Sequence, residues 1–300
     1  MTSFKGLLIR NIKIYFKDKI FFFTSLITPL ILLFLFIAFL NQTYRNIILS
    51  FFPSTGDVSS SLVNGYSGCF LLSSIMSVTS VTVSFSTNLL SVQDKYRGQL
   101  SDFNSTPISR VILSISYYFS SVISTLIICS ITLIISFIYI SIVGWYISFI
   151  DVLGIILVTI ILIFFGTSLS SLINLFLKTE GQVTAITVII SSGYGFLAGA
   201  YMPLSETNTI LRRILMFLPG TYGSIAMKNH ALSGCINEFS SLNMPSEAID
   251  KLKYVSDISL DFFGMDVSLL ACYLVLICST LVFLALFIVL SKFRKTSARL

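Results

Sequence analysis

The sequence predicts an all-α, polytopic membrane protein with six transmembrane helices. Three observations lead to this prediction: 55% of the 300 residues are hydrophobic, only 11% are charged, and the mean hydropathy is +0.93. A soluble domain carries about 25% charged residues, because water must solvate its surface. The 19 basic and 13 acidic residues are too few for that, so the composition excludes water-soluble enzymes and DNA-binding proteins.

Six apolar segments are long enough to cross a bilayer, for which a helix needs about 20 residues. They are interpreted as spans at 20–40, 66–90, 111–143, 152–177, 183–202 and 267–290. The stretch 111–177 could hold three helices, but its clearest break is at Gly144 and Trp145, so we interpret it as two. The whole chain, 1–300, is expected to form a single transmembrane domain.

The distribution of Lys and Arg predicts the orientation of these spans. Of the 19 basic residues, 13 fall in the N-terminal segment, the loop at 91–110, the turn near 178–181 and the C-terminal tail. Cytoplasmic flanks carry such an excess, so both termini are expected in the cytoplasm and nucleic acid is not an expected partner. Low Ala and high Ile, Phe, Ser and Asn usage is typical of an AT-rich bacterial genome, which indicates a bacterial plasma membrane.

Residues 1–19 have the pattern of an amphipathic helix that precedes the first span. Apolar side chains share one face and basic side chains the other: Phe4, Leu8, Ile12 and Tyr15 against Arg10, Lys13 and Lys17. Such a helix is expected in the cytoplasmic headgroup layer, in contact with membrane lipids. The alternative is an ordinary positively charged flank that only fixes the topology.

The segment 91–110 is the most highly charged cytoplasmic stretch between two predicted spans. Gly98 should break the helix, a short helix should follow at about 99–105, and Pro107 should end it. Ser109 is placed to cap the third span. A short polar helix joined to two spans could transmit a push from a partner, although every polytopic protein also needs polar inner loops.

This loop resembles the coupling-helix region of the permeases of type-2 ABC transporters, the ABC-2 family. The similarity rests on a pattern of ten residues: Asp94, Lys95, Gly98, Asp102, Phe103, Thr106, Pro107, Ile108, Ser109 and Arg110. The chain departs from the commonest form of the pattern. It has Asp94, and later Gln99 and Leu100, where many members have Glu and Thr-Leu.

A second segment resembles the same family. The residues FLAGAYMPLS (196–205) and FLPGTYG (217–223) are similar to the part of those permeases where a re-entrant pair of short helices follows the fifth span. The resemblance covers nearly the whole chain through the order of its parts. These are an amphipathic start, six spans, an inner loop after the second span and a large outer loop before the sixth.

The resemblance implies a dimer of permeases, each bound to a separate ATP-binding cassette subunit whose ATP hydrolysis drives export. The expected partners are this ATPase subunit and a second permease copy, identical or related. The residues expected to couple to the ATPase are Asp94, Lys95, Arg97, Gly98, Asp102, Phe103, Pro107 and Arg110. The sequence has no GxxxxGK[ST] phosphate-binding loop. We therefore expect no cofactor and no enzymatic activity on this chain, with ATP and Mg²⁺ bound by the partner.

Two stripes of small or hydroxyl-bearing residues mark one face of the second and the fifth predicted span. They are Ser73, Ser77, Ser80, Ser84 and Thr87 on the second, and Thr184, Thr187, Ser191 and Gly195 on the fifth. Such faces let helices pack closely, line a route for polar groups, or do both. The resemblance favours a route, because it places spans two and five at the dimer interface.

The segment 203–266 is expected to form the re-entrant hairpin and an outer loop. Pro203 should end span five, and Pro219 with Gly220 should end the apolar run 210–218, which is too short to cross. Together with Tyr222, these residues are expected to form an outer gate. The alternative is an amphipathic surface helix.

Histidine and cysteine offer no clear site in the sequence. His230 is the only histidine and is expected as a solvated loop residue, which leaves no His-based metal or catalytic cluster. The five cysteines lack a metal-binding spacing. A disulfide between Cys69 and Cys235 stays an open alternative.

The predicted function is that of the permease subunit of an ATP-driven exporter. The six span cores contain no ionisable residue, which disfavours a proton-coupled carrier. An amphipathic cargo is favoured instead, such as a drug, a peptide or a lipid-like molecule. The alternatives are a polysaccharide or ion exporter of the same family, or a non-ABC membrane channel or sensor subunit.

Overall fold

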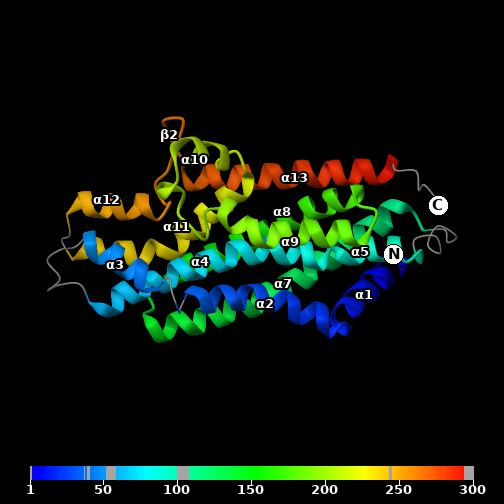
Figure 1. The fold of residues 1–300 in the computed structure, drawn as a ribbon, viewed down its shortest axis with the longest axis horizontal. Helices are drawn as coiled ribbons and strands as arrows, with labels where there is room; N and C mark the ends of the chain where they lie inside the picture. The colour runs from blue at the N-terminus through cyan, green and yellow to red at the C-terminus, as the bar shows by residue number, and fades with distance from the viewer. Residues whose placement is uncertain are drawn as a thin grey trace.

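Helices make up almost all of the described chain (Figure 1). The computed structural model describes residues 2–36, 38, 41–51, 59–99, 108–242 and 245–293. In chain order the elements are α1 Thr2–Lys17, α2 Lys19–Leu35, α3 Asn41–Phe51, α4 Ser60–Thr87, α5 Leu89–Tyr96, α7 Arg110–Val143, α8 Phe149–Phe176, α9 Glu180–Leu197, η2 Leu204–Glu206, α10 Thr209–Leu215, α11 Pro219–Ser241, α12 Ser246–Val255, β1 Asp261–Phe262, β2 Met265–Asp266 and α13 Leu269–Phe293. The two short strands pair antiparallel, with Phe262 opposite Met265.

Among the described residues, four helical stretches are long and apolar enough to cross a membrane. They are Ser60–Lys95, which joins α4 to α5, Arg110–Val143, Phe149–Phe176 and Leu269–Lys292. Two shorter apolar helices, Ser25–Phe34 within α2 and Gly181–Leu197 within α9, run beside α4 (Figure 1). The described chain is thus an all-α polytopic membrane protein, as the sequence predicts.

Helix α7 shows how an apolar segment and a cap together set a boundary. It covers Arg110–Val143, against a predicted span of 111–143. Ser109 caps it as expected, because the Ile112 N–H donates a hydrogen bond of 3.3 Å to Ser109 Oγ. This bond satisfies one of the backbone donors that the first turn of a helix leaves free.

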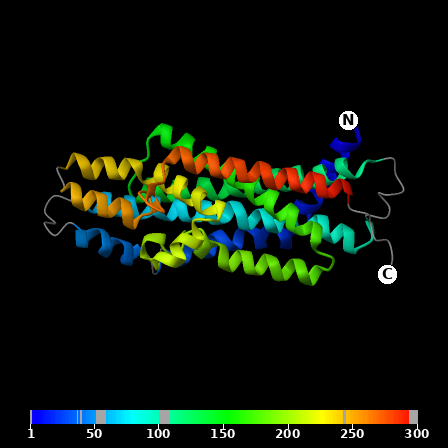
Figure 2. The same cartoon turned by 90° about the horizontal axis from the view of Figure 1, so that it is seen from above.

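The bundle has two ends, which lie at opposite extremes of its long axis (Figure 1; Figure 2). Helices α1 and α5 and the last turn of α13 lie at one of them, which we call the α1 end. Helices α3 and α12 lie at the other, the α12 end. The first and the last helix of the described chain therefore reach the same end of the bundle.

Helix α4 occupies the centre, in contact with α2, α7, α8, α9 and α11. Its most apolar stretch is completely buried, whereas those of α7, α8 and α13 are 28%, 44% and 22% buried. Small residues permit the central position. A Cβ on Gly166 of α8 would lie 3.0 Å from the Cα of Val81, so the two backbones approach closely at this glycine. The apolar surface left open on α7, α8 and α13 is of the kind that lipid covers.

The segment 203–266 differs most from the sequence-based expectation. Helix α9 ends at Leu197, before Gly199 with its φ of 68°, and not at Pro203. Pro219 starts α11, where its missing N–H leaves no helical hydrogen bond unmade. Helix α11 then continues for 23 residues and packs against α4, α8 and α13. Much of the expected outer loop is therefore a packed helix.

Candidate coupling site and transport regions

An ion pair connects α1 to the end of α5. The Arg10 guanidinium lies 2.6 Å from the Asp94 carboxylate, and the two side chains are 28% and 4% exposed. Arg10 also donates to Gln99 Oε1 at 2.6 Å and to Asn11 Oδ1 at 2.8 Å. The planar guanidinium can serve these acceptors at once because its donors point in several directions.

Tyr117 of α7 completes this cluster. Its hydroxyl donates a hydrogen bond to the same Asp94 carboxylate, and its ring packs with Leu7 of α1 and Leu113 of α7. Burial alone would lower the pKa of Arg10, but the hydrogen bond and charge of Asp94 outweigh burial and raise that pKa above its ordinary value. Arg10, Asp94 and Tyr117 therefore form a charged connection between α1, α5 and α7, which we call the α1–α5–α7 tie.

Helix α1 packs along α7 through a stripe that lies one step away from the predicted apolar face. Leu7, Asn11 and Tyr15 are its buried residues, with Asn11 only 1% exposed. The Phe4 ring meets the Phe119 ring edge to face, with centroids 6.4 Å apart. The N-terminal helix thus contacts another helix of the same chain, in addition to any contact with lipid.

The other expected coupling residues lie in different surroundings. Lys95 Nζ donates to the Leu177 carbonyl oxygen, in the turn between α8 and α9. Arg97 and Arg110 are exposed. Gly98 has a φ of 79°, a left-handed conformation that lets the chain turn after α5. Three further expected residues lie outside the described residues: Asp102, Phe103 and Pro107.

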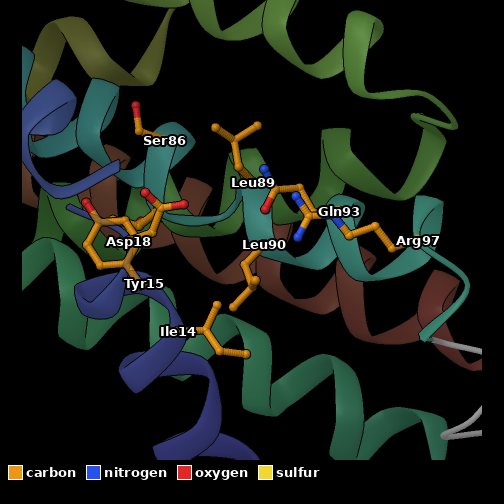
Figure 3. Close-up of a pocket in the computed structure, with 9 residues that line it drawn as sticks. Ile14, Tyr15, Asp18, Ser86, Leu89, Leu90, Gln93 and Arg97 are labelled. Carbon is orange, nitrogen blue, oxygen red and sulfur yellow. The ribbon is translucent and has the colours of Figure 1, made fainter. Parts of the chain in front are cut away.

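A small cleft lies beside the α1–α5–α7 tie (Figure 3). Ile14, Tyr15 and Asp18 line it from the side of α1. Helices α4 and α5 and the junction that follows contribute the remaining lining residues: Ser86, Thr87, Leu89, Leu90, Gln93 and Arg97. The end of α1 is therefore not packed against the α4–α5 junction over its whole length.

The hydroxyl stripe of α4 lies inside the bundle. All five of its side chains are at most 5% exposed: Ser73, Ser77, Ser80, Ser84 and Thr87. Ser77 and Ser84 each donate 2.7 Å hydrogen bonds to the carbonyl oxygen one turn earlier. Thr87 shares hydrogen bonds of 2.6 and 2.9 Å with Ser121 and Thr125 of α7. These partners favour a role in helix packing within one chain.

The stripe of α9 lies closer to the surface. Thr184 is exposed, Thr187 and Ser191 are half-buried, and Gly195 is buried. A Cβ on Gly195 would lie 2.2 Å from Cζ of Tyr201, so only glycine fits beneath that ring. Helix α9 therefore presents small polar side chains on a face that the single chain leaves partly open.

The expected gate residues lie around the start of α11. Pro203 is buried just before η2, Pro219 is half-buried in the first turn of α11, and Tyr222 is 8% exposed. A Cβ on Gly220 would lie 2.3 Å from the hydroxyl oxygen of Tyr194 on α9. The end of α9 and the start of α11 thus meet at a point where a larger side chain would not fit.

A buried ion pair that the sequence analysis does not predict lies in the same region. Lys228 Nζ of α11 is 2.7 Å from Asp257 Oδ2, and both side chains are 1% exposed. The ammonium also donates to the Gly199 carbonyl oxygen at 2.7 Å and lies 5.0 Å from the centre of the Phe70 ring on α4. The charge is therefore compensated on several sides, as burial requires.

Asp257 extends these contacts to η2. Its carboxylate oxygens accept hydrogen bonds from the N–H groups of Leu204 and Ser205, each at 2.9 Å. Asp257 lies in the turn after α12 and has a φ of 59°. The ion pair thus connects the end of α9, η2, α11 and the turn after α12 to the central helix.

His230 is not the solvated loop residue that the sequence analysis expects. It lies on α11, with Nε2 2.8 Å from the Tyr273 hydroxyl of α13 and Nδ1 3.5 Å from Asp151 Oδ1 of α8. A Cβ on Gly154 would lie 2.4 Å from the imidazole, so this glycine makes room for the ring. The expectation is wrong because it rests on treating α11 as a loop.

Cysteines and acidic residues form no further site in the part of the chain that the structure describes. Cys69 and Cys235 are both buried free thiols. The described residues contain no group of three or more His, Cys, Asp or Glu that could hold a metal ion.

The sequence of most of this chain matches a known protein family. A sequence model of the ABC-2 type transporter family matches residues 2–229, about three quarters of the chain. The chain belongs to the ABC-2 type transporter family. The matched part of this ABC-2 transporter runs from α1 into α11, and so includes the α1–α5–α7 tie, both stripes and the gate residues. A comparison with curated proteins finds no match.

Membership in the ABC-2 family identifies the chain as a permease subunit, the membrane component of a transporter and not its catalytic unit. The match ends within α11. Helix α12, the β-hairpin and α13 therefore follow the matched region.

Proposed function

We propose that this ABC-2 permease is the membrane subunit of an ATP-driven exporter, works as a dimer and binds separate ATP-binding cassette subunits. The observation that carries the proposal is the α1–α5–α7 tie of Arg10, Asp94 and Tyr117. It joins three helices next to the turn at Gly98. A push on the segment that follows would therefore move the three helices together.

The residues of the coupling region take two roles in this proposal. Arg97 and Arg110 are exposed and would contact the ATPase directly. Asp94 is buried, so its role is to position α1 against α5. Lys95 contacts the turn between α8 and α9 and would pass the movement on to these helices.

We place the α1 end in the cytoplasm, with six spans and both termini on that side of a bacterial plasma membrane. Basic residues of the elements at this end support the orientation: Lys5, Lys13, Lys17, Arg97, Arg110, Lys178 and Lys292. At about 1.5 Å per residue, the 18 residues of α9 rise about 27 Å. This length is close to a hydrocarbon core of about 30 Å, so α9 and the similar α2 complete the six crossings.

The proposed cargo is an amphipathic molecule, such as a drug, a peptide or a lipid-like compound. Asp94, Lys228 and Asp257 are buried charges that are paired within the chain, which suits neither an ion site nor a proton relay. The half-buried hydroxyls of Thr187 and Ser191 support a weakly polar route along α9, facing a second copy. The contact of Gly220 with Tyr194 supports a gate at the outer end of that route.

Site-directed crosslinking tests the partnership with an ATPase. The full chain, with the exposed Cys278 replaced by Ser, would carry either Arg97→Cys at the α1 end or the matched control Glu247→Cys at the α12 end. Each variant would be treated with a thiol-reactive photocrosslinker in membranes of the organism that encodes it. We expect Arg97→Cys to capture a polypeptide that hydrolyses ATP and contains a GxxxxGK[ST] loop.

The control decides between coupling and chance contact. Glu247→Cys should capture no such polypeptide, because α12 lies at the opposite end of the bundle (Figure 1). Capture of the ATPase by Glu247→Cys alone would reverse the proposed orientation. Extraction of the Arg97→Cys chain without an ATPase partner, under gentle detergent, would refute the proposed coupling.

A further inference from the structure

Helix α10 lies next to the β1–β2 hairpin (Figure 1). The two elements and the residues that follow α10 carry large apolar side chains that are exposed, and Phe217 contacts Phe262 and Phe263. The exposed side chains are Ile210 (69% exposed), Ile214 (58%), Phe217 (69%), Phe263 (56%) and Met265 (70%), and we call this surface the outer ridge. Soluble surfaces rarely gather large apolar side chains in one patch without a binding partner. The outer ridge therefore indicates an interaction that the single chain does not satisfy.

The outer ridge is held in shape by its own aromatic rings. Phe217 and Phe262 meet edge to face with ring centroids 5.2 Å apart, and Phe262 and Phe263 do so at 4.8 Å. Gly264 and Phe263 form the hairpin turn, with φ values of 81° and 53°. A left-handed φ suits glycine but is strained for phenylalanine. The strained residue is thus the one that presents an exposed ring at the hairpin tip.

Two arginines border the outer ridge, Arg212 and Arg213, and among the described residues only Arg212 forms an ion pair with an acidic side chain. Arg212 donates to the Tyr254 hydroxyl and lies 3.7 Å from the Asp261 carboxylate, so an acidic residue of the chain balances its charge. Arg213 is exposed, and its guanidinium lies 5.0 Å from the centre of the Phe263 ring. None of the ion pairs of the described residues includes Arg213. It therefore offers a positive charge to an external anion, and guanidinium matches phosphate.

The hairpin lies immediately before a membrane span. Strand β2 ends at Asp266, and α13, which is long enough to cross, begins at Leu269. Leu270 and Leu274 in the first turns of α13 are 68% and 54% exposed, as side chains that face lipid would be. The outer ridge thus adjoins a lipid-facing surface at its edge. Aromatic and arginine side chains at such an edge favour the headgroup layer.

We propose that the outer ridge inserts into the phospholipid headgroup layer at this end of the spans, with Phe217, Phe263 and Met265 against the upper acyl chains and Arg213 on a lipid phosphate. The inference uses the orientation of the proposed function only to name this leaflet the outer one, and it needs no ATPase. The hairpin also lies beyond the family match, which ends at residue 229. Insertion of the outer ridge would set how deep in the bilayer α13 begins.

Fluorescence quenching by lipid tests the insertion, with the full chain in nanodiscs of phosphatidylcholine and phosphatidylglycerol. Trp145 is the only tryptophan, so Trp145→Phe removes the background signal. Met265→Trp then reports from β2, and Phe263→Trp is a second reporter at the strained turn. Phosphatidylcholine carries bromine either near the headgroup or near the end of the acyl chain. We expect blue-shifted emission and a larger loss of intensity with the shallow bromines, because bromine quenches only at short range.

Two control reporters bracket the expected result. Leu274→Trp on α13 reports a lipid-facing position, and Glu247→Trp, which replaces an 81% exposed side chain on α12, reports a water-facing one. One result would overturn the proposal: aqueous iodide quenches the fluorescence of Met265→Trp as strongly as that of Glu247→Trp, and the brominated lipids do not reduce the fluorescence of Met265→Trp. Blue-shifted emission without bromine quenching would also overturn it, because a second copy of the chain would then cover the ridge.

The phosphate contact has its own test in the Met265→Trp protein. Arg213→Ala should reduce quenching by the shallow bromines, since the anchoring charge is lost, whereas Arg213→Lys should retain most of it. Arg212→Ala is the matched control, because Asp261 already balances that charge. Equal quenching in Arg213→Ala and the parent protein would refute the contact with phosphate.

Discussion

Arg10 and Asp94 are 84 residues apart in the sequence, and their side chains are 2.6 Å apart in the structure. The pair joins the amphipathic N-terminal helix to the end of α5. Asp94 is 4% exposed, so a movement that separated α1 from α5 would leave a buried carboxylate without its cation. Such a separation is strongly unfavourable. Helices α1 and α5 are therefore expected to move together.

Removal of the Arg10 side chain tests this relationship. Arg10→Ala leaves Asp94 with only the Tyr117 hydroxyl among its side-chain partners on the tie, and we expect a loss of about 1–3 kcal/mol of stability. The loss should concentrate at α1, so trypsin should cleave faster after Lys13 and Lys17. Thermal unfolding in detergent and timed proteolysis measure the two effects. Lys13→Ala, an exposed change on the same helix, should leave the unfolding temperature unchanged; an equal fall would show that Arg10 has no special role.

The pKa of Arg10 predicts a contact that survives alkaline pH. Burial alone would lower this pKa, but Asp94 raises it above its ordinary value in the folded protein. A base with a raised pKa contributes its full stability below its unfolded pKa, which for Arg lies far above neutral pH, and loses it only as the pH rises through the folded pKa. Amide-exchange protection of α1, corrected for intrinsic rates, should therefore be equal at about pH 7 and about pH 10.

The variant Arg10→Lys gives the contrast that this prediction needs. An ordinary lysine has a pKa of about 10.4, and the charge of Asp94 would raise the pKa of a lysine at position 10 in the folded protein. Protection of α1 should then stay constant up to about pH 10 and fall as the pH rises further, in the variant alone. A parallel fall in the parent protein would show that another group controls the contact.

The buried pair of Lys228 and Asp257 should be among the most sensitive positions in the chain. Lys228→Met leaves an uncompensated carboxylate at a site that is 1% exposed, and breaking such a pair costs about 3–5 kcal/mol. The thermal unfolding temperature should fall accordingly. Hydrogen exchange should rise at Leu204 and Ser205, whose N–H groups bond to Asp257.

A double-mutant cycle separates the ion pair from general damage to the core. Asp257→Asn keeps an oxygen for the backbone donors and tolerates the left-handed φ. The double variant Lys228→Met with Asp257→Asn should lose less stability than the sum of the two single changes, by about 0.5–3 kcal/mol. Strict additivity would show that the charges do not interact.

A glycine on α11 tests whether this segment is a packed helix. A Cβ on Gly234 would lie 1.7 Å from the carbonyl oxygen of Tyr146, so Gly234→Ala forces backbone apart and should destabilise the protein by about 1–3 kcal/mol. Gly6→Ala is the control, because no atom lies within 4 Å of a Cβ there. It should be neutral or stabilise α1 by about 0.5–1 kcal/mol. Equal effects on thermal unfolding would contradict the packing of α11.

Hydropathy predicts helices of this chain where apolar runs and helices coincide, and fails where polar residues enter a packed helix. The predicted span 111–143 agrees with α7 to within one residue. Helix α8 starts at Phe149, before the predicted 152, because Ser148 Oγ accepts a hydrogen bond from the Asp151 N–H. Hydropathy misses α11, because the polar residues Lys228, Asn229 and His230 interrupt its apolar residues.

A periodic signal for α11 is present even so. Ile225, Leu232, Ile236 and Phe239 recur at helical spacing, and each is at most 6% exposed. For the coupling region, the sequence indicates the loop but not the partner of Asp94. The sequence places Arg10 on the polar face of the N-terminal helix. Its contact with Asp94 could not be predicted, because helical periodicity relates only residues a few positions apart and these two are 84 residues apart.

The two stripes should respond differently to a water-soluble, positively charged methanethiosulfonate reagent. Single cysteines would replace Ser77 or Ser80 of α4, or Thr187 or Ser191 of α9, in a chain with Cys278→Ser; the other four native cysteines are buried. Ser77 and Ser80 are 0% exposed, so Ser77→Cys and Ser80→Cys should stay unlabelled until the protein is unfolded. Thr187→Cys and Ser191→Cys should be labelled in proteoliposomes, with mass spectrometry as the readout.

This contrast reports hydration and needs no knowledge of the cargo. The thiolate, not the thiol, reacts, and a thiol in apolar surroundings stays protonated. Labelling at Thr187 and Ser191 therefore requires water along α9, which a route for polar groups supplies and a lipid-covered face does not. Labelling of Ser77→Cys at the rate of Ser191→Cys would move the route to α4. Protection of both α9 positions would remove the route from α9, and its hydroxyls would then serve helix packing alone.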